Sequence, residues 1–491
     1  MAAALNASES STTWFVGTGR RRLAWLIVLA AALSLAFARL VLSTNMAAVA
    51  VLAVVVALIA ICVQPRTGVF LLFGMVLYFD GVYLDPLMAP AAYLYASIQT
   101  TLKINGAILI PLEMLLLVIS CIWLAHGIMR RRIQFQGGFF GRPMFLFVLA
   151  LVFGAVRGMV AGANFNYVFW ESRFLFCMVL SYILVTNTIR TRAHVRSLTS
   201  LIFVCVSLAA IDGVWRKFAL INNGLLGSAQ EFWYSHDGVV IWGLLVVLVL
   251  AQQVFSSGPR WQRVAGPFLG LAMVYTLMVS ERRAGVIAVM VALAAFTFAL
   301  VTIKRKAFLL IALPGLLVAA VYLPLFWNSG GTLGQGARAV RSISSPDARD
   351  ASSNAWRDLE AINVRATIAS DPLLGIGFGR PFLQVVTVPD ISGFEFWNYE
   401  SHHDILWVWM KTGALGFICF FGLVLGGVAR SVWLAKTLPQ LDLKTFALVG
   451  TTAIVMSLVY CYVDLGLTEP RIPILLGVVL GTVGVLDRVR E

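Results

Sequence analysis

Long apolar runs alternate with short polar loops along almost the whole chain of 491 residues. A membrane-spanning helix needs about 20 predominantly apolar residues, and about fourteen runs come close to that length. They begin near residues 24, 45, 67, 104, 143, 173, 197, 238, 264, 284, 306, 405, 445 and 472. The third run is short, and some others are candidates for half-helices. The pattern therefore predicts an all-α polytopic integral membrane protein with about 12–14 transmembrane helices.

The compact clusters of Lys and Arg fall on loops of one side of this arrangement. Short basic loops of membrane proteins usually face the cytoplasm. The clusters are "GRRR" at residues 19–22, "MRRRIQFQGGFFGR", "TIRTRAHVR", "SSGPRWQR", "IKRK", "RSVWLAKTLPQLDLK" and "DRVRE". We therefore expect both chain termini in the cytoplasm. The first run resembles a signal peptide, but another span follows at once, so we expect the first helix to be retained.

One long polar segment, residues 327–402, then lies on the outer side before the last three helices. Ser352 and Ser353 can cap a helix within it, and a stripe of apolar residues at 3.6-residue spacing follows. An Asp-Pro pair at residues 371–372 ends the stripe. The segment is thus predicted to contain a helix at about residues 353–370.

This segment divides the chain into three parts. Residues 1–326 are expected to form an N-terminal transmembrane bundle. Residues 327–402 are the extracytoplasmic loop, and residues 403–491 supply the C-terminal transmembrane helices. All three are expected to belong to one membrane domain.

Composition supports a membrane protein over a soluble one. The chain is 60% hydrophobic and 12% charged, with a mean hydropathy of +0.88, whereas soluble domains carry about 25% charged residues. The net charge of +14 is explained by basic cytoplasmic loops, so no nucleic-acid partner is expected. The six cysteines all fall inside apolar runs without a C-x-x-C pair, which predicts neither a disulfide framework nor a zinc site.

Several cations run against the charge rule because they lie at outer helix ends: Arg173, Arg216, Lys217, Arg282 and Arg283. Each one alone could reach lipid head groups or a neighbouring acid such as Glu171 or Glu281. Together on one membrane face they favour a basic pocket for a phosphorylated ligand. The guanidinium group holds phosphate oxygens in pairs and stays charged at physiological pH.

Two adjacent histidines, His402 and His403, stand where the outer segment meets the next apolar run. A neutral imidazole can accept a proton at physiological pH, although a histidine can also be merely a polar residue at a helix end. Metal binding by the two histidines and Asp404 is disfavoured, because adjacent side chains rarely converge on one ion and no fourth ligand is evident.

Three glycines at residues 375, 377 and 379 in "PLLGIGFGRP" have the spacing of a phosphate-binding loop. Such a loop follows a strand and opens a helix, and neither is predicted here. The glycines therefore predict a tight turn.

The stretch "HHDILWVWMKTGALG" resembles the signature of the O-antigen ligase and polymerase superfamily. That signature reads approximately His-Asn, two residues, Leu, six residues, Gly, two residues, Gly. The spacing selects His402, with Leu406, Gly413 and Gly416 in register. His403 occupies the usual asparagine position, so the choice between the two imidazoles stays open.

The resemblance extends over about residues 165–430. "VSERRAGVIAV" is similar to the family's arginine-bearing helix start, which selects Arg283 with Arg282 beside it. "ESRFLFCMVL" resembles the stretch that bears another functional arginine, which falls on Arg173. "NAWRDLEAINVRATIASDPLLGIGFG" resembles the outer segment before the histidine, and it brings Arg357 and Arg365 as candidate substrate-binding residues.

The resemblance implies an enzyme that moves a glycan from an undecaprenyl-diphosphate carrier to an acceptor hydroxyl. Such enzymes act on the outer face of the bacterial inner membrane, without nucleotide sugar, metal or other cofactor. The acceptor is a lipid A core in ligases and a carrier-linked glycan in polymerases, and the sequence does not choose between them. Besides the lipid bilayer, other polysaccharide-assembly membrane proteins are candidate partners.

The resemblance and the outer cations together assign His402, Arg283 and Arg173 to catalysis, and Arg282, Arg216, His403, Arg357 and Arg365 to substrate binding; Arg216 comes from its place among the outer cations. A direct displacement would invert the anomeric centre, and no carboxylate pair for a retaining mechanism is evident. The alternatives are a transporter or flippase that moves lipid-linked glycans without chemistry, and an assembly scaffold without activity.

Overall fold

The computed structural model describes residues 46–80, 94–97, 99, 108–129, 131, 135–224, 235–389, 393 and 396–490, with side chains from residue 54 onward. The predicted first helix, near residue 24, lies outside these residues. The chain divides into two compact units, Met1–Gly68 and Val69–Glu491. The first unit contains α2 (Met46–Val63) and the start of α3 (Pro65–Tyr78). Proline at the first position of α3 separates the two helices, because proline has no backbone N–H to continue the preceding hydrogen-bond ladder.

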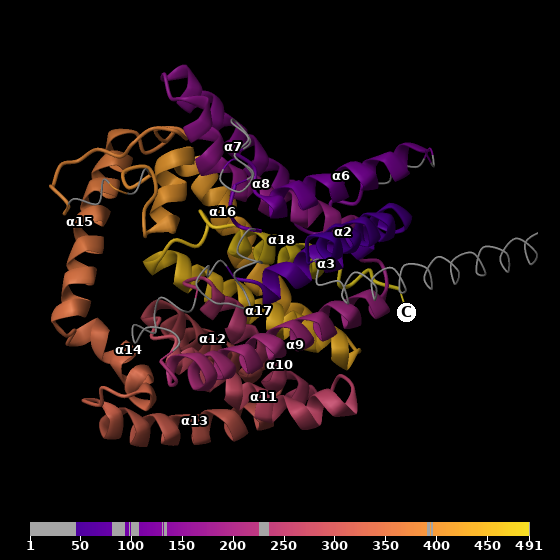
Figure 1. Ribbon diagram of the computed structural model, residues 1–491, viewed down its shortest axis with the longest axis vertical. Helices are drawn as coiled ribbons and strands as arrows, with labels where there is room; N and C mark the ends of the chain where they lie inside the picture. The colour runs from indigo at the N-terminus through magenta and orange to yellow at the C-terminus, as the bar shows by residue number, and fades with distance from the viewer. Residues whose placement is uncertain are drawn as a thin grey trace, which may run out of the picture. The chain divides into compact units, whose positions relative to one another are not determined.

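The second unit is a helical bundle with an outer helical segment (Figure 1). Its helices are α6 (Pro111–Met129), α7 (Gly141–Val160), α8 (Phe165–Thr188), α9 (Arg192–Trp215), α10 (Gly238–Phe255), α11 (Arg260–Val279), α12 (Arg283–Ile303), α13 (Arg305–Phe326), α14 (Gln335–Ser344), α15 (Ala348–Ser370), α16 (Asp404–Thr437), α17 (Leu441–Val463) and α18 (Arg471–Val483). A π-helical turn, Arg216–Ile221, extends α9.

Within the described part of the chain, ten helices are long and apolar enough to cross a membrane. Residues 54–63, α3 and α18 are shorter apolar helices. Each apolar run predicted from residue 45 onward corresponds to one of these helices. The predicted class, an all-helical polytopic membrane protein, is confirmed.

Helix α17 lies at the centre of the bundle, where it packs against α9, α10, α12, α16 and α18. Helix α8 packs along α18. Of the most apolar stretch of each helix, 83% is buried in α10 and 72% in α17, but none in α13. The apolar surface of α13 therefore needs lipid or another protein around it, whereas α10 and α17 form the protein core.

Loops that the charge pattern assigns to the same side contact one another. Arg190 and Arg192 exchange backbone hydrogen bonds with Arg490 near the C-terminal end. The Arg192 and Arg196 guanidinium groups bind the carboxylate of Asp442 at the start of α17, with N–O distances of 2.8 and 2.5 Å. These basic loops thus lie close together at one end of the bundle.

The outer segment contains two helices where the sequence predicted one. Helix α14 was not predicted, and α15 begins at Ala348 rather than near residue 353. The side chain of Asp347 accepts a hydrogen bond from the backbone N–H of Asp350 at 2.9 Å. This aspartate therefore caps the helix, and the serines chosen from the sequence lie inside it. Helix α15 runs across the helices of the bundle rather than along them (Figure 1).

Helix α16 is broken near its beginning. Gly413 has φ 69° and ψ −173°, which no helical residue adopts. The N–H of Ala414 donates to the carbonyls of Pro372 and Leu373 at 3.0 and 3.1 Å instead of to its own helix. A Cβ at Gly413 would lie 2.5 Å from the carbonyl carbon of Leu374. The glycine of the family signature thus lets the loop that follows α15 insert into the helix.

That loop carries the three glycines at the spacing of a phosphate-binding loop. Gly375, Gly377 and Gly379 all have positive φ, at 70°, 85° and 77°. A Cβ at Gly377 would lie 2.8 Å from the Cα of Gly158 in α7, and the N–H of Phe378 donates to the Gly154 carbonyl at 3.1 Å. The predicted tight turn is confirmed, and the turn packs against two helices.

A buried ion pair holds the same loop from the other side. Lys411 of α16 and Glu171 of α8 are both 0% exposed, with 2.6 Å between Nζ and Oε1. Lys411 Nζ also donates to the carbonyl of Arg380 at 2.5 Å, and Glu171 accepts from the N–H of Gly379. Two transmembrane helices and the loop are therefore joined by one charged cluster.

We expect Gly377→Ala to lower the free energy of unfolding by about 1–3 kcal/mol or more. The left-handed backbone at a residue other than glycine costs about that much, and the added Cβ also meets α7. The measurement is the midpoint of thermal unfolding of the purified protein in detergent. Gly422→Ala is the matched control, since nothing lies within 4 Å of a Cβ there. Equal midpoints for the two variants would contradict this account of the loop.

Lys411→Met should lower the unfolding free energy by about 3–5 kcal/mol, because it leaves the Glu171 charge buried and unpaired. The double variant Glu171→Gln with Lys411→Met should recover much of this loss. Thermal unfolding of the wild type, both single variants and the double variant measures the coupling. Additive losses would show that the two side chains do not depend on each other.

Candidate functional site

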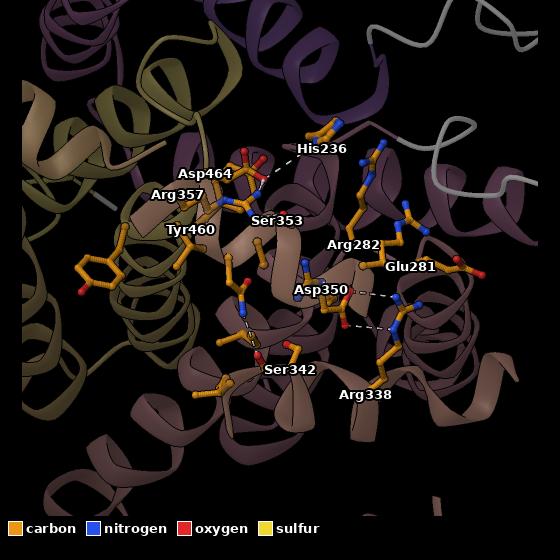
Figure 2. A pocket seen from close by; sticks show the side chains of 18 of the residues that line it. His236, Glu281, Arg282, Arg338, Ser342, Asp350, Ser353, Arg357, Tyr460 and Asp464 are labelled. Atoms are coloured by element: carbon orange, nitrogen blue, oxygen red, sulfur yellow. Dashed lines mark hydrogen bonds and ion pairs between the residues drawn. The ribbon is translucent and has the colours of Figure 1, made fainter. Parts of the chain in front are cut away.

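A cavity of about 530 Å³ lies where the beginning of α12, helices α14 and α15, the start of α16 and the end of α17 meet. Its lining includes five arginines and four acids: Arg282, Arg283, Arg338, Arg349, Arg357, Glu281, Asp350, Asp358 and Asp464. Figure 2 shows many of these side chains converging from different helices. Since Asp442 begins α17 and Asp464 follows its end, the cavity lies at the other end of that helix from the basic loops.

The arginines at the start of α12 are placed by a tight turn and an acid. Glu281 has a φ of 56°, an uncommon left-handed conformation that ends α11 and turns the chain into α12. Arg283 Nε lies 3.3 Å from Asp350 Oδ1, and Arg338 Nη2 lies 3.0 Å from the same oxygen. Asp350 is 2% exposed. One buried carboxylate therefore orients an arginine from α12 and another from α14, as drawn for Arg338 in Figure 2.

A second acid organises the other wall. Arg357 of α15 donates to Ser353 Oγ at 2.6 Å, and its Nη2 lies 4.0 Å from Asp464 Oδ2. His236 Nδ1 lies 3.8 Å from the same oxygen, so the three side chains form the cluster labelled in Figure 2. Burial alone would raise the pKa of Asp464, but the His236, Arg357 and His402 charges lower that pKa to about 2. This carboxylate stays ionised at physiological pH.

Helix α15 supplies side chains to both walls and to the histidines from one face. Asp350, Ser353, Arg357 and Glu360 follow one another at intervals of three, four and three residues. Side chains at these intervals stand on the same side of a helix. The position of α15 therefore sets the geometry of the whole site.

Some buried polar atoms around the cavity have no hydrogen-bond partner among the described residues. They include Arg357 Nε, Tyr460 Oη and His403 Nδ1, and all three residues line the cavity. Buried polar atoms are nearly always paired, and an unpaired one commonly marks a place for water or a ligand. The arrangement suits an oxygen-rich ligand that can accept from several donors at once.

The two histidines have different surroundings. His403 lines the cavity, and burial lowers the pKa of its imidazole. His402 is not among the residues that line the cavity; its side chain is 26% exposed, and its Nδ1 lies 3.3 Å from Glu360 Oε2. The edge of the Trp356 ring packs against it, with 4.8 Å between ring centroids. His402 is therefore the histidine whose ring is held by an acid.

The structure brings four of the eight predicted site residues to the cavity lining, Arg282, Arg283, Arg357 and His403, and it places His402 directly before His403, against Glu360. It does not bring the other three there. Arg173 is buried 3.5 Å from Glu113 of α6 with its guanidinium over the Trp170 ring at 3.7 Å. Arg216 is buried between Asp80 and Asp212, at 3.3 and 2.7 Å, and Arg365 is exposed on α15. The roles assigned to these three stay predictions.

Sequence reasoning missed Arg338, Asp350, Glu360 and Asp464. The acids lie far along the chain from the cations they bind, so only the fold pairs them. One signal was available for Asp464, because the polar stretch "DLGLTEPR" interrupts the last apolar runs. For Glu360 the signal was its place on one face of the predicted helix with Ser353 and Arg357, whereas Asp350 precedes that predicted helix and had no such signal.

The described residues contain no group of three or more His, Cys, Asp or Glu side chains that could hold a metal ion. The acids near the histidines are instead engaged by cations and by backbone N–H groups. The donors that could meet a ligand here are arginines, histidines and a tyrosine.

The fold and the cavity define an integral membrane protein with an arginine-lined polar site. Residues 268–421 match the family model described as O-antigen ligase. The match confirms the resemblance of this part of the chain to a domain of the O-antigen ligase and polymerase superfamily. The match covers α12, α14 and α15, which carry Arg283 and Arg357, and it also covers the loop with both histidines and the beginning of α16. This domain supports a membrane glycosyltransferase of the ligase or polymerase type. A comparison with curated proteins found no match.

Proposed function

We propose that the protein transfers a glycan from an undecaprenyl-diphosphate carrier to an acceptor hydroxyl on the outer face of the bacterial inner membrane. The observation that carries the proposal is the cavity of about 530 Å³ lined by five arginines beside the histidine motif. The gathering of the basic loops at the opposite end of α17 supports the outer location, since such loops usually face the cytoplasm.

The donor's leaving group is a diphosphate whose negative charge grows as the bond to the sugar breaks. Arg283 and Arg338 reach the cavity with their positions fixed by Asp350, and Arg357 stands on the other wall. Guanidinium groups placed in advance stabilise such charge without reorganising during the reaction. In other enzymes a divalent cation often takes this task, and the arginines would take it here.

The acceptor needs a base. We assign this role to His402, which matches the family's histidine, with His403 as a cavity-lining residue that binds substrate. The acceptor oxygen forms a bond to the anomeric carbon as the bond from that carbon to the diphosphate oxygen breaks. The diphosphate leaves with the electron pair, and the hydroxyl proton passes to the imidazole and then to solvent. A single displacement of this kind inverts the anomeric centre.

The nature of the acceptor decides between ligase and polymerase. The test is a transfer assay with purified protein in liposomes, undecaprenyl-diphosphate oligosaccharide as donor, and either no added acceptor or a lipid A core. Lengthened carrier-linked glycan indicates a polymerase, and glycan on the added core indicates a ligase. Lipid-linked glycan that crosses the bilayer without any product would replace the enzyme by a transporter.

In this assay His402→Ala should lower the transfer rate by about 10²–10⁴-fold, the usual contribution of a general base. His403→Ala should have a smaller effect on kcat and raise KM, because the residue lines the cavity. His126→Ala on α6 is the matched control and should behave as wild type. A fully active His402→Ala protein, or a larger kcat loss in His403→Ala, would reverse the assignment.

Arg283→Lys should lower kcat/KM by about 10–100-fold, because lysine keeps the charge but loses the paired donors worth about 1.5–3 kcal/mol for a charged hydrogen bond. Initial rates against donor concentration measure the effect. Arg305→Lys, at the start of α13 and exposed, controls for the substitution itself. Unchanged kinetics in Arg283→Lys would reduce this arginine to a generic positive charge.

A further inference from the structure

Glu360 is a buried acid that none of the sequence predictions assigned. It lies on α15 and is 1% exposed. Its Oε2 accepts the backbone N–H of His402 at 2.8 Å and the hydroxyl of Ser401 at 3.2 Å. The same carboxylate lies beside the His402 ring, with Nδ1 at 3.3 Å from Oε2 and 3.4 Å from Oε1. One side chain thus holds both the backbone and the imidazole of His402.

This contact determines which ring nitrogen carries the proton. A carboxylate only accepts hydrogen bonds, so the Nδ1 that faces it is a donor. In a neutral imidazole the other nitrogen, Nε2, then carries the lone pair. The nitrogen that can take a proton from an acceptor hydroxyl is therefore Nε2, and the contact stops the ring from turning the wrong nitrogen toward the substrate.

We infer that Glu360 is the positioning residue for His402, and that it also stabilises the imidazolium formed when the acceptor hydroxyl gives up its proton. The inference rests on the proposed function, because it assumes that His402 is the base. The arrangement follows a common pattern in which a base activates a nucleophile and a third group orients the base. Here the acceptor hydroxyl is the nucleophile, His402 the base and Glu360 the third group.

The surroundings favour a rigid arrangement over an incidental contact. The Trp356 ring packs edge-on against His402, with ring centroids 4.8 Å apart. Trp356 and Glu360 both stand on α15, which also carries Arg357 to the cavity wall. Movement of α15 would therefore shift the base and a diphosphate-binding arginine together. Glu360 thus keeps the position of His402 constant relative to Arg357.

Other charges also act on the histidine and must be kept constant in a test. Asp464, in the loop after α17, interacts electrostatically with His402. His403, the next residue in the chain, interacts electrostatically with His402, Glu360 and Arg365. Asp464 is shared with Arg357 and His236, whereas Glu360 is the acid within 3.5 Å of the His402 ring. Substitution at residue 360 therefore changes the contact with the His402 ring and leaves Asp464 and its partners in place.

The test is the Glu360→Gln variant in the transfer assay, measured as kcat against pH. Glutamine keeps the size and can still accept the backbone N–H, but it removes the negative charge. We expect kcat to fall by about 10–100-fold with little change in KM, which corresponds to about 1.4–2.7 kcal/mol of activation free energy. The acid limb of the profile should move to lower pH, because the imidazolium loses its negative neighbour.

Glu360→Asp keeps the negative charge, but on a shorter side chain and so farther from the His402 ring. It should return the acid limb toward its wild-type position with a partial recovery of kcat. Asp487→Asn removes an acid that binds Arg430 and should leave both kcat and the profile unchanged. Thermal unfolding of each variant separates loss of folded protein from loss of chemistry.

The outcomes distinguish the inference from the proposed function. An inactive His402→Ala protein together with a Glu360→Gln protein of wild-type kcat and pH profile would overturn the inference alone. A Glu360→Gln protein whose activity falls equally at every pH, in proportion to its loss of folded protein, would make Glu360 a structural residue. An active His402→Ala protein would remove the base assignment and the inference with it.

Discussion

The buried pair of Glu171 and Lys411 is the interaction on which the geometry of this protein depends. Two charges without access to water are costly, and they are tolerated only when each finds further polar partners. Here those partners are the backbone groups of Gly379 and Arg380 in the loop that follows α15. The pair therefore ties α8, the first turns of α16 and that loop into one body.

The ion pair also affects the position of the histidines, through the break in α16. The loop occupies the gap that Gly413 opens, and its glycines let it pack directly on α7. The short helical piece before the break begins just after His402 and His403. With its far side fixed by the ion pair and its near side held by α15, this piece gives the histidines a defined position at the start of α16.

Helix α15 joins the two chemical halves of the site. Its first turn carries Asp350, which orients arginines from α12 and α14, and three turns later Glu360 holds the backbone and the ring of His402. Acids that bind arginines reduce their charge but fix their direction, and a fixed donor serves a developing negative charge better than a mobile one. The same helix thus contacts both the arginines of the cavity and His402.

The sequence by itself determined the membrane helices and the identity of the histidine motif, because length, apolarity and close-range spacing are local properties of the chain. It also selected Arg283, since that arginine opens a helix on the side opposite the basic loops. It did not reveal that Arg173 and Arg216 are bound by Glu113 and by Asp80 and Asp212. Whether a cation faces a cavity or a buried acid depends on contacts between residues far apart along the chain. Only the tertiary structure decides those contacts, since packing alone brings such residues within the few ångströms over which ion pairs form.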